Sequence, residues 1–239
     1  MSAKPPVLLH LGCGLGRLEG WVNCDKYPTE FADAVFDLEE RWPFEDGQVR
    51  EIYASHVLEH VGHEHFFREA WRVLEPNGGI CVRVPYGGHR LAWSDPTHVK
   101  AWWAESFCYL QPDYGRVVGN PQEFGWPAPF GVAKISLRLA AKWARLMRNR
   151  WTRRLLLPWF ENIENSVEEL WAWLYAIKDQ ASRDEFTSTR SSNAVPVLYT
   201  MYTHHYEGRA TLREGEMPAL TTLRGSETVG RYGFDAIPN

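Results

Sequence analysis

The feature that most constrains the fold is a short apolar run that ends in a glycine-rich loop. Val7-Leu8-Leu9-His10-Leu11 is followed at once by Gly12-Cys13-Gly14-Leu15-Gly16. This pattern is typical of a buried parallel strand that enters a tight loop. Glycine has no Cβ and accepts positive φ, so a ligand can lie against the bare backbone. The sequence therefore predicts a ligand-binding loop directly after the first strand.

Further strand candidates follow, with helices between them. The runs 21–25, 34–37, 51–55 and 80–84 are short and apolar, and an amphipathic helix is expected from about residue 63 to 75. Such alternation with short connections favours a mostly parallel sheet. We therefore predict an α/β fold, a Rossmann-like doubly wound sheet with a helical insertion late in the chain.

The pattern changes after residue 87, where a stretch rich in Trp, Pro and Gly begins. Helical spacing then extends from about residue 132 to 182, and residues 195–206 are rich in β-branched and aromatic side chains. We expect four regions: a ligand-binding core at 1–130, a helical insertion or lid at 131–190, a late sheet strand at 191–210 and a loosely packed tail at 211–239.

Composition and charge exclude several classes of protein. The chain is 44% hydrophobic and 23% charged, as in ordinary soluble domains, and its net charge of −4 does not favour a general nucleic-acid binder. The basic segment 134–154 leaves nucleic acid open as a partner, although a solvated helix face is the favoured interpretation. No run approaches the ~18 apolar residues of a membrane span.

The four cysteines match neither a zinc-binding spacing nor a disulfide scaffold. We therefore expect a reduced, cytoplasmic protein. The sequence does not indicate an oligomeric state.

Two carboxylates fall at the ends of successive predicted strands. Asp25 ends the second strand and Asp37 ends the third. In a doubly wound sheet these ends lie along the edge where ligands bind, so the carboxylates can meet ribose hydroxyls and an exocyclic amine. Asp25 follows Gly16 by only nine residues, whereas a dinucleotide site places its acid ~20 residues on. The pattern favours a nucleoside ligand other than a dinucleotide.

Later motifs occur in a fixed order over residues 10–85. They are Gly20-Trp21-Val22-Asn23-Cys24-Asp25, Asp37-Leu38, Trp42-Pro43-Phe44-Glu45-Asp46, Ser55-His56-Val57-Leu58-Glu59-His60 and Arg72-Val73-Leu74-Glu75-Pro76-Asn77-Gly78-Gly79. With the glycine loop, this series resembles the class I S-adenosylmethionine-dependent methyltransferases, especially small bacterial and phage members. One position departs from the family: His10 stands where an acidic residue commonly precedes the loop.

The resemblance implies a methyltransferase that uses S-adenosylmethionine. It assigns cofactor binding to Gly12, Cys13, Gly14, Gly16, Asp25, Asp37, Leu38, Ser55 and His56. A non-catalytic protein that binds this cofactor or another nucleoside remains an alternative, because His10 changes the position that supports the methionine end.

The segment His56-Val57-Leu58-Glu59-His60 also fits the H-x-x-E-H pattern of zinc proteases. In that pattern two helical histidines one turn apart hold the metal, and a zinc hydrolase is therefore a second, less favoured alternative. We interpret Glu59 and His60 as helix-start and packing residues and expect no bound metal.

The residues that bind the methyl acceptor are expected after the fifth strand. Asp95-Pro96-Thr97-His98 lies in the region where the resembling family binds its acceptor. His98 oriented by Asp95 could remove a proton, so the two residues are candidate catalytic groups. A structural role for His98 remains open. The expected acceptor is a small molecule or a sugar.

Overall fold

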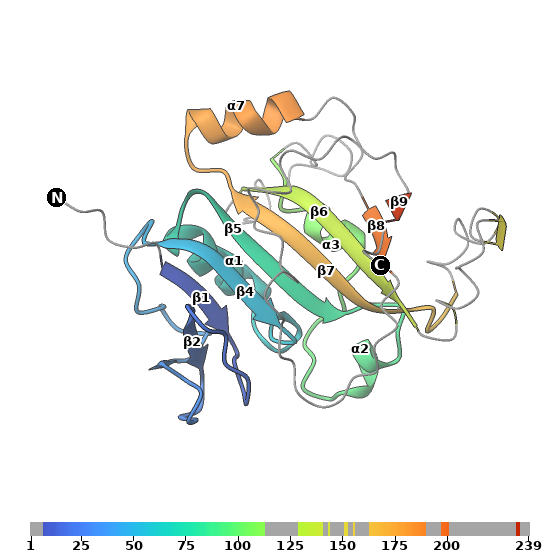
Figure 1. Cartoon of the computed structure of the whole chain (residues 1–239), viewed down its shortest axis with the longest axis horizontal. Coiled ribbons are helices and arrows are strands. Elements are labelled where there is room, and N and C mark those ends of the chain that lie inside the picture. Colours follow the sequence, from blue (N-terminus) through green and yellow to red (C-terminus); the bar gives the residue numbers. More distant parts are fainter. Residues whose placement is uncertain are drawn as a thin grey trace.

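One twisted sheet organises the described part of the chain (Figure 1). The computed structural model describes residues 7–112, 129–140, 143, 151–152, 155, 163–189, 197–200 and 233–234. Within these residues the sheet has nine strands in the order β3-β2-β1-β4-β5-β7-β6-β8-β9. The predicted α/β fold with a mostly parallel sheet is confirmed.

The N-terminal half of the sheet is parallel throughout. Its strands are β1 (Val7–Leu11), β2 (Val22–Asp25), β3 (Ala34–Val35), β4 (Val49–Ser55) and β5 (Leu74–Pro85). Strand β1 pairs with β2 on one side and β4 on the other, and β4 pairs with β5. Because all five strands run the same way, their carboxyl ends share one edge. Residues 12–21 join β1 to β2 through turns without a helix, which places Asp25 directly beside the glycine loop.

The other half contains two long antiparallel strands. They are β6 (Phe130–Leu139) and β7 (Val167–Ala176), and β7 lies antiparallel to both β5 and β6. The strands β8 (Val197–Thr200) and β9 (Gly233–Phe234) continue the sheet in parallel. Strand β8 falls inside the predicted late strand region 191–210.

The prediction of a helical insertion at 131–190 was wrong for β6 and β7. The buried apolar residues Ile135, Leu137 and Leu139 alternate with the polar residues Ser136 and Arg138 along β6, and this period of two in residue type marks a strand. Nearly every residue of β7 is buried, so its apolar run carries no helical period. Only α7 (Gln180–Thr189) is helical within 163–189. Most of 142–154 and of the tail 211–239 lies outside the described residues.

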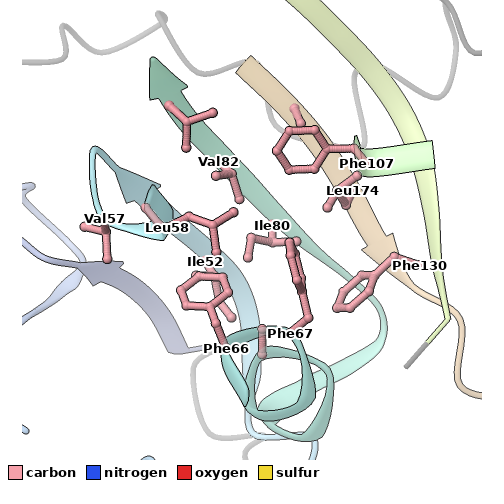
Figure 2. Close-up of a cluster of buried hydrophobic side chains, with 14 of the residues drawn as sticks. Ile52, Val57, Leu58, Phe66, Phe67, Ile80, Val82, Phe107, Phe130 and Leu174 are labelled. Carbon is pink, nitrogen blue, oxygen red and sulfur yellow. The ribbon is translucent and has the colours of Figure 1, made fainter. Parts of the chain in front are cut away.

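The helices cover one face of the sheet with apolar side chains. The elements are η1 (Leu58–His60), α1 (His63–Val73), α2 (Leu91–Ser94) and α3 (Ala104–Cys108), and α1 and α3 lie behind the strands in Figure 1. Figure 2 shows Phe66 and Phe67 of α1 against Ile52, Ile80 and Phe130 of the strands. Burying each such side chain stabilises the fold by about 1.5–3 kcal/mol.

Two expectations, one about membrane spans and one about the cysteines, can be compared with the described residues. No helix there has both the length and the apolar character that crossing a membrane requires. All four cysteines, which are described, are free thiols and are buried.

A buried ion pair fastens the segment after β3 to helix α1. Glu69 is 5% exposed, and its carboxylate accepts bonds from Arg72 and from the Trp42 N–H at 2.8 Å. Arg72 also donates to the carbonyl oxygens of Trp42 and Phe44 and to Asp46. The motif at residues 42–46 is therefore tied to α1, which holds one wall of the strand-end region.

We predict that Glu69→Gln destabilises the protein in a pH-dependent way. Burial opposes ionisation of Glu69, but hydrogen bonds from Arg72 and Trp42 outweigh it and lower the pKa of the carboxyl. A lowered pKa contributes stability above the unfolded value and loses it as pH falls through the folded value. Urea unfolding should show a loss of about 1–3 kcal/mol near neutral pH that shrinks in acid below about pH 4. An equal loss at every pH would contradict the ion-pair account.

Candidate functional site

A pocket of about 320 Å³ opens at the carboxyl ends of the parallel strands. It is lined by the ends of β1, β2, β3 and β4 and by the loops that follow them. The lining residues are Gly12, Cys24, Asp25, Lys26, Tyr27, Phe36, Asp37, Leu38, His56, Val57, His60 and Val61. The site therefore lies at the edge that the strand-end aspartates predicted.

The glycine loop brings backbone to the wall of this pocket. Gly12 and Gly14 have φ angles of +64° and +55°, which L side chains adopt at a cost. A Cβ on Gly12 would also overlap the side chain of Val57, whereas one on Gly14 would meet open space. Cys13 N–H donates to Cys24 O at 2.9 Å, which fixes the loop to β2. Gly12 is thus required both by conformation and by the close approach of the segment after β4.

The carboxylate of Asp25 connects the two loops. Its Oδ2 accepts a bond from Gly14 N–H at 2.7 Å, and its Oδ1 accepts one from Tyr27 N–H at 3.0 Å. A carboxylate offers about four lone-pair positions, so each oxygen keeps further capacity. Asp25 can therefore hold the loop and also accept bonds from two neighbouring hydroxyl groups in the pocket.

Asp37, which follows strand β3, also lines the pocket next to apolar side chains. Its Oδ2 forms an ion pair of 2.6 Å with Lys26, and its Oδ1 accepts a bond from Glu39 N–H at 3.0 Å. The hydrogen bond from Lys26 is the main cause that lowers the pKa of Asp37. Phe36 and Leu38 flank this carboxylate, so the wall combines a flat apolar surface with an acceptor.

The imidazole of His10, in strand β1, supports the loop through Asn23. Because the Asn23 amide nitrogen donates to Leu18 O, Trp21 O and Asp33, its oxygen accepts, and His10 Nδ1–H donates to it at 3.0 Å. His10 is 7% exposed and stacks on Tyr53, and burial lowers the pKa of its imidazole. His10 therefore stabilises the loop as an uncharged donor.

His56 joins the pocket to the antiparallel half of the sheet. Its φ is +54°, uncommon for a residue with a side chain, and its N–H donates to Arg83 O at 2.8 Å. Its imidazole nitrogens lie 3.3 Å from Glu59 Oε1 and 3.4 Å from Glu169 Oε1. Burial opposes protonation, but the neighbouring carboxylates of Glu169 and Glu59 outweigh it and raise the pKa of His56.

Glu169 is the centre of a buried charge network. Arg83 donates to both of its oxygens, at 2.9 and 2.6 Å, and Arg138 donates to Oε2 at 3.0 Å. Burial opposes ionisation of Glu169, but the bonds from His56 and Arg83 lower the pKa of its carboxyl. The network fixes β7 and β6 beside the end of β4, where His56 faces the pocket.

The H-x-x-E-H segment does not form the helical pair that a zinc protease uses. His56 precedes the short helix η1 and has a left-handed backbone, so His56 and His60 do not sit one α-helical turn apart. Glu59 and His60 instead meet His98, and one potential ligand atom from each lies within 4.8 Å of the others. These three residues could hold a metal ion.

The predicted acceptor residues lie beside His60. His98 Nε2 is 3.8 Å from Asp95 Oδ2, too far for a hydrogen bond, and His98 Nδ1 faces Ala92 O at 3.1 Å. Asp95 Oδ1 accepts the Thr97 hydroxyl at 2.7 Å, and that hydroxyl is 2.9 Å from His60 Nδ1. Asp95 is thus closer to orienting His60 than to orienting His98.

The pocket contains some of the predicted cofactor residues and not others. Gly12, Asp25, Asp37, Leu38 and His56 line it. Gly14 is joined to it through Asp25. The residues that do not line it are Cys13, Gly16, Ser55, Asp95 and His98.

Sequence reasoning missed several lining residues. They include Lys26, Tyr27, Phe36, Val57, His60 and Val61. Their positions directly beside Asp25, Asp37 and His56 were the available signal, because residues next to a strand-end carboxylate share its edge of the sheet.

The basic segment 134–154 is only partly described, and the two basic residues described in it lie on a strand. Lys134 and Arg138 lie on strand β6. The Lys134 ammonium lies 5.3 Å from the centre of the Trp173 ring, and Arg138 pairs with Glu169 and Glu168. The expectation of a helical face was wrong for these two residues, and the other six basic residues lie outside the described residues.

Comparisons with known proteins gave one matching family model and several similar solved structures. Residues 22–82 match the family model of a methyltransferase domain. The chain matches no curated protein. A solved S-adenosylmethionine-dependent methyltransferase from Archaeoglobus fulgidus is similar, with 14% identity, a TM-score of 0.46 and coverage of 71% of this chain and 86% of that one.

Two further solved structures show the same level of similarity. One is an S-adenosylmethionine-dependent methyltransferase from Mesorhizobium loti, with 12% identity, a TM-score of 0.42 and coverage of 71% and 90%. The other is geranyl diphosphate C-methyltransferase from Streptomyces coelicolor A3(2), with 12% identity, a TM-score of 0.43 and coverage of 72% and 70%.

We predict that Gly12→Ala damages the protein more than Gly14→Ala does. Both substitutions strain a positive φ, but only the first also forces a methyl group into Val57. Thermal unfolding should show the larger drop in Tm for Gly12→Ala. Equal drops would mean that the contact with Val57 is not tight.

Proposed function

We propose that the chain is a class I S-adenosylmethionine-dependent methyltransferase that transfers a methyl group from this cofactor to a small-molecule or sugar acceptor; the match of residues 22–82 to a methyltransferase-domain model supports this. The observation that supports this most is the pocket formed by Gly12, Asp25, Asp37 and His56 at one edge of the sheet. The four buried thiols fit a reducing compartment, and the proposal includes a cytoplasmic location.

The residues present fit the cofactor part by part. The free capacity of the Asp25 carboxylate suits the two ribose hydroxyls, as its contacts with Gly14 and Tyr27 leave lone pairs on both oxygens. Phe36 and Leu38 offer an apolar wall for the adenine ring, with Asp37 as acceptor for its amine. Gly12 lines the pocket, and the open space beside the bare backbone of Gly14 lets the ligand approach the loop.

Methyl transfer requires few catalytic groups from the protein. S-adenosylmethionine supplies an electrophilic methyl group on a sulfonium when it is bound. The protein must hold an acceptor atom in line with that group, keep water out and, for some acceptors, remove a proton. His56 and His60 line the pocket, and His98 and Asp95 lie behind His60. We assign these acceptor-side residues to holding and deprotonating the acceptor.

The two alternatives make different demands on the same site. A non-catalytic binding protein would keep the contacts of Asp25 and Asp37 and show no transfer to any acceptor. A zinc hydrolase would need His56 and His60 on one helical turn, and the left-handed φ of His56 disfavours that arrangement. Methyl transfer remains the function that the site supports best.

We predict that Asp25→Ala weakens binding of S-adenosylhomocysteine, the demethylated cofactor. Loss of bonds to a charged group should cost about 1.5–3 kcal/mol, or roughly 10- to 150-fold in Kd. Isothermal titration calorimetry measures this directly. Glu19→Ala is the matched control, because Glu19 is exposed in the same loop and does not line the pocket. Unchanged affinity in Asp25→Ala would remove the ribose assignment.

We predict that His98→Ala slows methyl transfer while leaving cofactor affinity nearly unchanged. A screen of sugars and small alcohols, amines and carboxylates with radiolabelled S-adenosylmethionine should identify an acceptor. With that acceptor the variant should be roughly 10²–10⁴-fold slower, as expected when a proton-transfer group is lost. A normal rate per folded molecule would show that His98 only packs, and a screen with no labelled product would favour the non-catalytic alternative.

A further inference from the structure

Three side chains with metal-binding atoms converge beside the proposed cofactor pocket. Glu59 and His60 belong to η1 after β4, and His98 belongs to the segment after α2. One ligand atom of each lies within 4.8 Å of the others, and the two imidazole rings are 4.7 Å apart between centroids. The backbone supports this arrangement, since Val99 N–H donates to Glu59 O at 2.8 Å. The fold therefore brings two distant parts of the sequence to one point.

The carboxylate of Glu59 is buried without a hydrogen-bond partner among the described residues. Glu59 is 1% exposed, and neither of its oxygens accepts a hydrogen bond there. The nearest charged contact is His56 Nδ1, 3.3 Å from Oε1, and His56 is shared with Glu169. A carboxylate removed from water is costly unless a cation or hydrogen bonds compensate it. The ion pair with His56 is made at Oε1 and is shared with Glu169, so we take Oε2, which accepts no hydrogen bond among the described residues, as the atom available to a further cation.

The hydrogen bonds of His98 leave one nitrogen free for a metal. Its Nδ1 lies 3.1 Å from Ala92 O, and a carbonyl oxygen only accepts, so this nitrogen carries the proton. The Nε2 of His98 consequently has a lone pair. A backbone carbonyl that orients the ring in this way is the usual outer contact of a metal-binding histidine.

The ring of His60 is also held by a hydrogen bond at Nδ1, here through Thr97 and Asp95. The Thr97 hydroxyl donates its proton to Asp95 Oδ1 at 2.7 Å, so it accepts from His60 Nδ1–H at 2.9 Å. The lone pair of His60 is then on Nε2. Thr97 and Asp95 therefore act on His60 as a carboxylate acts on a metal-binding histidine.

We propose that Glu59, His60 and His98 form a binding site for a divalent first-row transition metal ion such as Zn²⁺. Two imidazole nitrogens and one carboxylate suit such ions, and three protein ligands leave a coordination position open. This proposal replaces the expectation that the segment binds no metal. It differs from the H-x-x-E-H arrangement because the glutamate is a ligand and the second histidine comes from residue 98.

His60 also lines the cofactor pocket, which places the open position at its rim. An oxygen atom of the acceptor, from a hydroxyl or carboxylate group, is the ligand that this position would take. That part of the inference rests on the proposed function, whereas the metal site itself does not. His98 would then act on the acceptor through the ion, and the rate loss in His98→Ala would follow from loss of the ion.

The test uses the tag-free, full-length protein after treatment with a chelator. Titration calorimetry with ZnCl₂ should show one ion per chain, and elemental analysis after dialysis should show the same ratio. Loss of an outer contact costs about 10- to 100-fold in metal affinity. Glu59→Gln and His98→Gln each remove a proposed ligand, so they should weaken Zn²⁺ binding by more than this. His65→Gln is the matched control, because this half-buried histidine of α1 bonds to Glu40 O instead.

A second pair of variants keeps the test valid if the ligand variants fold poorly. Thr97→Val removes the hydrogen bond to His60 at an exposed position and should weaken Zn²⁺ binding about 10- to 100-fold, whereas Thr97→Ser keeps the hydroxyl and should bind normally. The site is refuted by absence of stoichiometric binding to the wild type, or by equal affinity in the wild type and folded Glu59→Gln. S-adenosylhomocysteine should bind the metal-free protein, so failure of the metal site and failure of the proposed function remain distinguishable.

Discussion

The close approach of Gly12 to Val57 is the constraint on which the site depends. It lets the first loop pack directly against the segment after β4, so both loops can line one pocket. A side chain at residue 12 would separate them and would also oppose the positive φ of the loop. Asp25 then holds the other side of the loop through Gly14 N–H. The pocket thus depends on backbone that packs closely on two sides.

The charge network around Glu169 fixes the remaining wall. Arg83, Arg138 and His56 all contact this carboxylate, which is 8% exposed. Removing one partner of a buried ion pair typically costs about 3–5 kcal/mol, because the other charge is left without compensation. The antiparallel strands β6 and β7 therefore do more than extend the sheet. They hold His56 at the pocket, next to the carboxylate of Glu59.

The parallel half of the fold and the edge that carries the pocket could be predicted because their signals are local. A strand, a glycine loop and the next strand-end carboxylate lie within Val7 to Asp25, and their order alone sets which edge they share. The antiparallel strands could not be identified in this way. A fully buried apolar run such as β7 has no alternation, and only pairing with β5 decides that it is a strand.

The cluster of Glu59, His60 and His98 depends on contacts that are distant in sequence. The pattern of residues 56–60 suggested a pair of histidines on one helix, but η1 is short and His56 lies outside it. The partner of Glu59 and His60 comes from a loop whose position is set by the Val99 to Glu59 backbone bond and by Ala92. No local sequence pattern predicts that these three side chains lie close together. Their proximity follows from how the segment after β5 folds back over the end of β4.

The most direct test of this account is a crystal structure of the protein with S-adenosylhomocysteine. The account predicts that both ribose hydroxyls bond to Asp25, that the adenine lies between Phe36 and Leu38 with its amine at Asp37, and that the sulfur faces His56. A ligand bound elsewhere, or one in this pocket with no contact to Asp25, would contradict the central claim.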